Sequence, residues 1–176
     1  YNPGFGLKVA RGFVETLRLL APMTSAVIAA GVVLALQWVL LNQGIWQTFA
    51  VSGLVLVAAG FVAAVATVLM KWLCVQRIKP GEHELWSAFV WLNELQDQFV
   101  ETVAGPWFLA HTMGTGSLNM FLRALGAKIG RGAWLDSYWL PEADLVSIGR
   151  GASVGPGCVV QTHLFQDRVM SLDTVT

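Results

Sequence analysis

Residues Leu19–Met70 decide the fold: LLAPMTSAVIAAGVVLALQWVLLNQGIWQTFAVSGLVLVAAGFVAAVATVLM. This stretch contains no Asp, Glu, Lys or Arg. A charge-free run of this length accommodates two membrane spans of about 20 residues each and a turn between them. The polar break Asn42-Gln43-Gly44 is typical of such a turn. We therefore expect a transmembrane helix pair in residues 1–80, with spans at about 23–41 and 45–72.

Positive charges flank this apolar stretch on both sides, and the turn between the spans carries none. The flanking cations are Lys8, Arg11 and Arg18 before the first span and Lys71, Arg77 and Lys79 after the second. Loops rich in Lys and Arg stay on the cytoplasmic side of a membrane. The pattern predicts a multi-pass protein of the inner or plasma membrane, with both ends of the hairpin and the soluble part in the cytoplasm.

Composition agrees with a lipid environment and excludes some classes of partner. The chain is 55 % hydrophobic and 12 % charged, which is too apolar for an ordinary soluble protein. Its formal net charge is zero, and the cations after Pro80 are scattered, so we expect no nucleic-acid partner. Cys74 and Cys158 lie in no CxxC motif and have no histidine at ligand spacing, so we expect no metal site.

Residues 81–125 are predicted to connect the membrane pair to a soluble domain. Apolar residues recur at helical spacing between Glu82 and Val103, which predicts an amphipathic helix that ends at Gly105-Pro106. The segment from Trp107 to Leu125 is apolar and aromatic but is interrupted by glycines. We expect it to be re-entrant or to lie in the membrane interface.

An internal repeat begins at residue 126. Ile129-Gly130-Arg131-Gly132-Ala133 recurs unchanged at residues 148–152, and aliphatic residues within each copy follow a six-residue step. This spacing is typical of a parallel β-helix, in which each aliphatic side chain stacks on the next coil. Because three hexads make 18 residues and the copies are 19 apart, we expect one extra residue to bulge out within Pro141–Asp144. Residues 126–176 would then be the truncated start of a hexapeptide-repeat domain whose further rungs follow Thr176.

The segment Gln161–Arg168 breaks the hexad rhythm, and a loop on a rigid coil can carry functional groups. His163 is suited to act as a general base because its ordinary pKa lies near neutrality. Asp167 could orient the imidazole. In the competing interpretation, His163 caps the coil and Asp167 pairs with Arg168 at the surface.

Four stretches carry a resemblance to a known family. They are residues 125–130, Trp134-Leu135-Asp136, residues 144–149 and the run Gln161-Thr162-His163-Leu164-Phe165-Gln166-Asp167-Arg168-Val169-Met170. Together with Leu85-Trp86-Ser87 and Asn93-Glu94-Leu95, they resemble the carboxy-terminal region of non-ribosomal peptide synthetases of the epsilon-poly-lysine synthetase type. Such enzymes look like adenylation and thiolation domains followed by six transmembrane helices and three tandem soluble domains. The resemblance implies that the tandem domains are left-handed β-helices akin to acyltransferases.

The implied function is peptide-bond formation, in which the amine of one amino acid attacks an aminoacyl thioester. The thioester would be carried on phosphopantetheine by a carrier domain of the same polypeptide, so no cofactor is expected to bind this chain directly. His163 and Asp167 are the expected catalytic residues; Asp136, Gln161, Thr162 and Arg168 are the expected substrate-binding residues. Membrane lipid, the carrier domain and the other helices and tandem domains are the expected partners. The fragment alone is expected to be inactive.

Two other functions fit the same sequence. A membrane-bound hexapeptide acetyltransferase would use the same histidine with coenzyme A as donor. A non-catalytic scaffold would use the β-helix to dock carrier domains beside the membrane.

Overall fold

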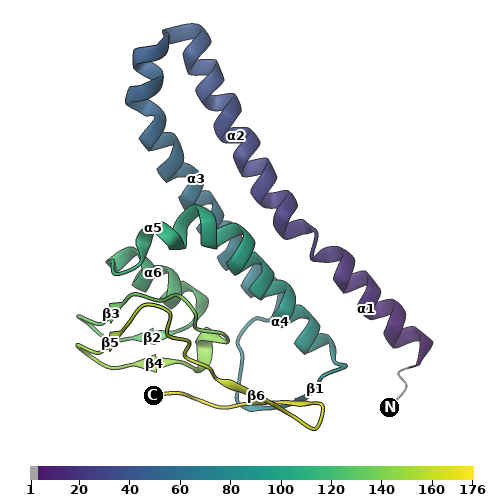
Figure 1. Cartoon of the computed structure of the whole chain (residues 1–176). Helices are drawn as coiled ribbons and strands as arrows, with labels where there is room; N and C mark the ends of the chain where they lie inside the picture. Colours follow the sequence, from purple (N-terminus) through teal and green to yellow (C-terminus); the bar gives the residue numbers. More distant parts are fainter. Residues whose placement is uncertain (1–3) are drawn as a thin grey trace.

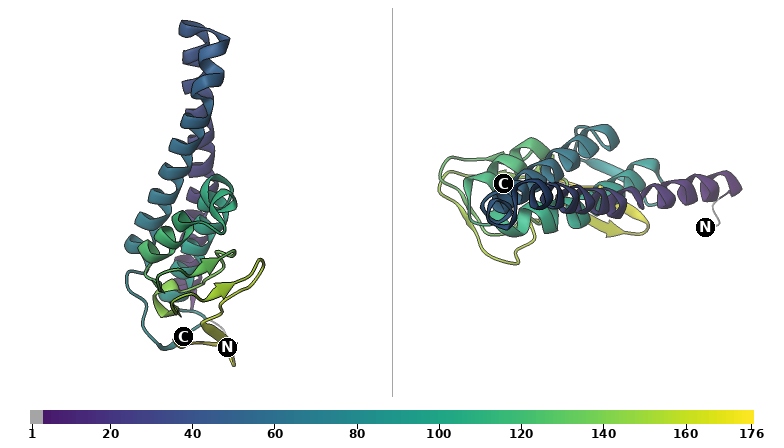
Figure 2. Two further views of the ribbon diagram at one scale, coloured as in Figure 1. Left: turned by 90° about the vertical axis from the view of Figure 1, so that its left-hand side faces the viewer. Right: turned by 90° about the horizontal axis from the view of Figure 1, so that it is seen from above.

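The computed structural model describes residues 4–176, and a long helical hairpin is its largest feature (Figure 1). Helix α1 (Phe5–Leu17) leads into α2 (Leu20–Gln43), and α3 (Ile45–Cys74) returns beside α2. The chain reverses at Gly44, whose φ of 92° favours a glycine. Figures 1 and 2 show the tip of the hairpin standing clear of the other elements, with the start of α1 and the C-terminus at its opposite end.

Large apolar side chains are exposed along both arms of the hairpin. Examples are Val27, Leu34 and Leu41 on α2 and Trp46, Leu54 and Phe61 on α3, each at least 64 % exposed. A helix that is apolar on every face is normally surrounded by protein or by lipid. The helical segments Phe5–Gln43 and Ile45–Cys74 are long and apolar enough to cross a membrane, as the sequence predicts.

The lower half of α3 presents a stripe of small residues to the rest of the protein. Ala59, Gly60, Ala63 and Ala64 are buried there, and they face the π-helical segment η1 (Val100–Leu109). A Cβ atom on Gly60 would lie 2.6 Å from the carbonyl oxygen of Trp107, so glycine allows the two backbones to touch. The Trp107 indole also donates a 2.8 Å hydrogen bond to Ser25 on α2. The η1 segment therefore contacts both arms of the hairpin.

The helix expected over residues 82–103 begins later than the sequence pattern indicates. Residues Gly81–Glu84 form strand β1, and α4 spans Ala88–Phe99. The Ser87 hydroxyl caps α4 by accepting the Val90 N–H at 3.5 Å. Strand β1 pairs with a distant strand, and such tertiary pairing overrides the local helical periodicity.

Gly105-Pro106 does not end the helical segment, contrary to the sequence-based expectation. Helix α4 continues directly as η1, which contains Pro106, and then as the short helix α5 (Ala110–Thr112). The widened π turns accommodate the proline, which has no N–H to donate. Helix α6 (Gly116–Leu125) follows and ends at Gly126 in the left-handed conformation.

The two copies of the sequence repeat pair with each other in parallel. Strand β2 (Lys128–Ile129) pairs with β4 (Ser147–Ile148), and β3 (Trp134–Leu135) pairs with β5 (Ser153–Val154). Ile129 lies opposite Ile148, so the structural register equals the 19-residue sequence repeat. These short pairs do not by themselves make a solenoid, and the left-handed β-helix stays a prediction.

The repeat region and helix α3 share one hydrophobic core. Ile129 and Leu135 of the first repeat belong to the same buried cluster as Ala64 of α3, and Val68 packs against it. The 3-10 helix η2 (Ala143–Leu145) lies between the two repeat copies, where the extra residue was expected. The hairpin is therefore part of the packing that positions the repeat region.

The chain ends in an antiparallel sheet of strand order β1-β7-β6. Strands β6 (His163–Gln166) and β7 (Val169–Leu172) form a hairpin, with His163 opposite Leu172. Strand β1 adds to the other edge of β7, with Gly81 opposite Leu172. This sheet joins the segment after α3 to the excursion that carries His163.

Candidate functional site

A buried carboxylate, Glu142, is the centre of a polar cluster between α4 and the repeat region. Its side chain is fully buried, and its Oε1 accepts a 2.8 Å hydrogen bond from Asn93 Nδ2. Its Oε2 lies 2.5 Å from the Thr162 hydroxyl and 2.9 Å from His163 Nδ1. A buried carboxylate with several hydrogen bonds is held in one orientation, because each lost partner leaves a desolvated polar group.

His163 faces this carboxylate from the first position of β6. An ionised carboxylate can only accept a hydrogen bond, so this contact favours the tautomer with the proton on His163 Nδ1, which leaves the lone pair of the neutral ring on Nε2. The side chain is 17 % exposed, and the Phe165 ring lies 5.1 Å away between ring centres. A carboxylate that fixes the tautomer of a partly exposed histidine is the arrangement of a general base.

Helix α4 contributes Asp97 to the surroundings of Glu142. Both side chains line a cavity of about 30 Å³, together with Asn93 and Gln96. The pKa of Asp97 is raised to about 7, first by burial and then by the negative charge of Glu142 and of other nearby carboxylates, while His163 acts in the opposite direction. Near neutral pH, Asp97 therefore holds a proton for part of the time beside the His163–Glu142 pair.

The raised pKa of Asp97 predicts a dependence of stability on pH. Between its ordinary pKa of 3.8 and about 7, the folded protein keeps a proton that the unfolded chain has released. The free energy of unfolding should therefore fall as pH rises through this window. Asp97→Asn removes the charge. At pH 8 we expect it to raise Tm by about 2–4 °C for each 1 kcal/mol by which the free energy of unfolding increases.

The measurement is thermal unfolding in detergent at pH 5 and at pH 8, with the exposed Asp173→Asn as the control. The gain from Asp97→Asn should be larger at pH 8 than at pH 5, and Asp173→Asn should show no such difference. Equal gains at both pH values would contradict the assignment.

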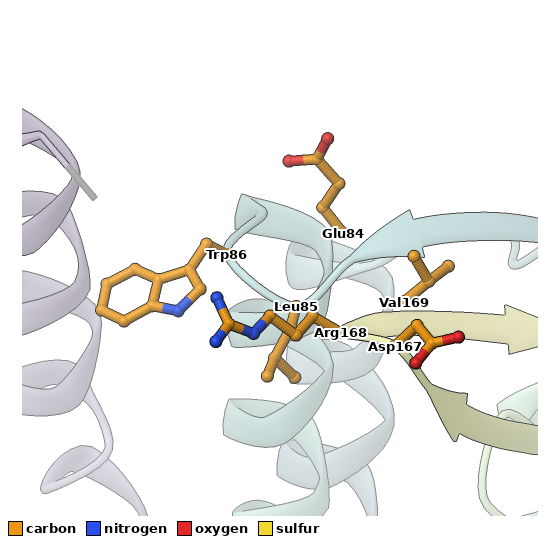
Figure 3. A pocket seen from close by; sticks show the side chains of 6 residues that line it. All are labelled: Glu84, Leu85, Trp86, Asp167, Arg168 and Val169. Carbon is orange, nitrogen blue, oxygen red and sulfur yellow. The ribbon is translucent and has the colours of Figure 1, made fainter. Parts of the chain in front are cut away.

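Asp167, which the sequence analysis placed beside His163, lies at the opposite end of the β6–β7 hairpin. It is exposed and has φ 48°, and the neighbouring Arg168 has φ 68°. Figure 3 shows the Arg168 guanidinium directed toward Trp86 while Asp167 points away from it. These residues line a separate pocket of about 220 Å³. The carboxylate that contacts His163 is Glu142, not Asp167.

The other expected site residues are spread around the repeat region. Thr162 is buried and contacts Glu142, so it belongs to the cluster. Gln161 precedes it and is exposed. The Asp136 N–H donates to Val154 O at 2.9 Å, as part of the pairing between repeat copies. Of the six predicted residues, His163 and Thr162 meet at Glu142, whereas Asp167 and Arg168 lie together at the separate pocket.

Glu142 and Asn93 were missed as site residues: no motif marks Glu142, and Asn93 stood in a stretch that carried the resemblance without a role. The available signal was the extra residue in the 19-residue repeat, which indicated an irregular turn at Pro141–Asp144 but not a function. No group of three or more His, Cys, Asp or Glu side chains within residues 4–176 is placed to hold a metal ion. Cys74 and Cys158 are free thiols.

Comparison with known proteins gives one informative relative. Over 176 residues, the chain is 34 % identical to the Delta-poly-L-ornithine synthetase of Acinetobacter baumannii (strain AB307-0294). The chain resembles part of a poly-amino-acid synthetase. The alignment covers 99 % of this chain and 13 % of the length of that relative. No family model and no solved structure matches.

This relative agrees with the sequence-based resemblance at the level of poly-amino-acid synthetases. The name of that enzyme specifies ornithine, whereas the sequence motifs resemble the poly-lysine type. The resemblance to poly-lysine synthetases in particular stays a prediction.

Proposed function

We propose that this chain carries an aminoacyl-transfer site of a membrane-bound poly-amino-acid synthetase, with His163 as general base. The observation that carries the proposal is the 2.9 Å contact between His163 Nδ1 and the buried Glu142 carboxylate. The similarity to a poly-ornithine synthetase supports the same class of reaction. The acceptor would be an amine of a diamino acid such as ornithine or lysine.

In the proposed reaction, the amine attacks the carbonyl carbon of a carrier-bound aminoacyl thioester. A C–N bond forms and the C–S bond breaks; His163 Nε2 takes the proton from the amine and returns it to the departing thiolate. Since the thioester is already activated, the protein supplies mainly orientation and proton transfer. Glu142 keeps the proton on Nδ1, so Nε2 stays the accepting atom. The partly exposed ring of His163 suits a thioester delivered on the flexible phosphopantetheine arm of the carrier.

We also propose that residues 126–176 begin a left-handed β-helix. The parallel pairing of the repeat copies in a 19-residue register supports this. In the second copy, Ile148, Val154 and Val160 are partly buried and pack against the shared core, as expected for a coil on which another can stack.

The proposed location is the inner membrane, with the hairpin tip on the far side and the repeat region in the cytoplasm. A cysteine placed at Gln43 should then react with a membrane-impermeant maleimide added from outside the cytoplasm, while the exposed Cys158 should react only after permeabilisation. Cys74→Ser should be included so that Cys158 is the single native thiol within residues 1–176. Labelling of position 43 from the cytoplasmic side alone would reject the topology.

The choice of donor separates the proposed function from its alternatives. The synthetase that contains this segment should transfer an aminoacyl group from a carrier-bound thioester to a free diamino acid in a single turnover. The same preparation should transfer no acetyl group from acetyl-coenzyme A. Acetyl transfer would support the hexapeptide acetyltransferase alternative, and normal carrier binding without any transfer would support a docking scaffold.

A further inference from the structure

A buried ion pair connects the membrane helix α3 to the turn that carries Glu142. Lys71 Nζ in the last turn of α3 lies 2.7 Å from Asp144 Oδ2, and the two side chains are 3 % and 5 % exposed. The same oxygen accepts the Ile78 N–H at 3.1 Å. One carboxylate thus holds together the end of α3, the segment after it and the η2 turn.

The η2 turn has an unfavourable conformation at Glu142. This residue has φ 44° and ψ 57°, in the left-handed region that disfavours side chains other than glycine. Such a conformation persists where the surrounding structure over-determines it. Within the turn, the Leu145 N–H donates to Glu142 O at 2.8 Å. The Lys71–Asp144 pair then fixes the turn from outside, two residues beyond Glu142.

Close packing leaves the Asp144 carboxylate little freedom on one side. A Cβ atom at Gly126 would lie 2.1 Å from Asp144 Oδ1, so the glycine makes room for that oxygen. On the other side, Lys71 and Glu142 both line the cavity of about 30 Å³ next to α4. If the ion pair were lost, this cavity would offer the turn space to shift.

Stability alone does not explain a lysine in this place. A buried ion pair gains little over well-packed apolar side chains, because desolvation of both charges offsets their attraction. What the pair does supply is a unique position for the turn. We propose that Lys71 is a positioning residue for the transfer site, holding the Glu142 carboxylate against His163 Nδ1 through Asp144. The inference rests on the proposed role of His163.

The test replaces the pair by apolar side chains so that no unpaired charge is left buried. The full-length synthetase carrying Lys71→Met and Asp144→Leu should insert and load its carrier but show kcat lowered by roughly tenfold, the size of effect that outer-shell partners of a site have. KM for the amine should stay the same. The conservative Lys71→Arg keeps the charge and should retain most of kcat.

A spectroscopic measurement follows the contact itself. In the chain labelled with 15N-histidine and placed in lipid nanodiscs, the wild type should show the Nδ1–H tautomer at His163, assigned by loss of the signal in His163→Ala. The Lys71→Met/Asp144→Leu variant should show a tautomer mixture. Wild-type tautomer and wild-type kcat in that variant would overturn the inference.

A double-mutant cycle with Glu142→Gln separates positioning from a general loss of structure. If Lys71 acts through Glu142, adding Lys71→Met and Asp144→Leu to Glu142→Gln should lower kcat little further. An undiminished further loss would show that the ion pair does not act through Glu142. Failure of the proposed function is a distinct result. In that case His163→Ala would still transfer the aminoacyl group, and the tautomer of His163 could still be compared between the wild type and the Lys71→Met/Asp144→Leu variant.

Discussion

His163→Ala should slow peptide-bond formation by roughly 100-fold or more, the usual contribution of a general base. The expectation follows from the 2.9 Å contact that fixes the proton on Nδ1 and leaves Nε2 to accept one from the amine. Membrane insertion and thioester loading should not change, because loading occurs before the amine attacks. The measurement is single-turnover transfer from a preloaded carrier, with loading assayed separately.

The matched control is His111→Ala, which removes an exposed histidine far from Glu142 in the sequence. It should leave the transfer rate unchanged. A correctly inserted His163→Ala protein that makes polymer at the wild-type rate would reject the general-base role and favour the scaffold function.

Glu142→Gln should have the next largest effect on the transfer rate. We expect a loss of more than about tenfold, but less than the ~100-fold or more expected when the base itself is removed. A glutamine amide cannot accept at both ends. If its oxygen faces His163 and Thr162, its NH2 group opposes the Asn93 NH2 group that now donates to Oε1. In the flipped orientation the glutamine donates to His163 Nδ1, which favours the unproductive tautomer.

Asp167→Asn is the control for this substitution, since Asp167 is the acid that sequence proximity suggests. It is exposed at the hairpin turn, and its loss should leave the transfer rate within about twofold, because surface substitutions rarely perturb a site they do not touch. A larger loss in Asp167→Asn than in Glu142→Gln would reverse the assignment of the orienting carboxylate.

The helical hairpin could be predicted from the sequence because its cause is local. An apolar run without charges and a polar turn determine α2, α3 and the reversal at Gly44 with little help from the rest of the chain. The parallel register of the repeat copies could be predicted for a similar reason, because identical pentapeptides occupy equivalent positions in the two paired copies.

The elements between these parts could not be predicted in detail, since they depend on distant partners. Residues 82–84 were predicted to begin a helix, but they belong to β1, which pairs with β7 more than 80 residues away. Pro106 is a strong helix-stop signal, yet the helix continues because η1 packs on the small-residue stripe of α3. In both cases tertiary contacts outweigh a local preference.

One of the two central residues of the candidate site could be predicted from the sequence. His163 could be found because it interrupts a repeat, and an interruption is visible in a single sequence. Its partner could not, because Glu142 reaches it only after the chain has folded through the left-handed turn at Pro141–Asp144. Asp167 is nearer in sequence. However, His163 begins β6 and Asp167 lies in the turn that follows it, so the extended strand keeps the two side chains apart.

The core that α3 shares with the repeat region also sets an order of events during synthesis. The ribosome makes α3 first. Its small-residue stripe can meet η1 about 40 residues later, but the core shared with the repeat region is complete only when Val160 has been made, about 100 residues beyond Ala64, which takes several seconds or more at ~5–20 residues per second. If the hairpin lies in a membrane as proposed, the part of α3 that faces this core, and Lys71, have lipid, headgroups or the insertion machinery as neighbours until then. The repeat region therefore cannot complete its core before α3 is in place, and in the proposed membrane protein this makes insertion of the hairpin an early step.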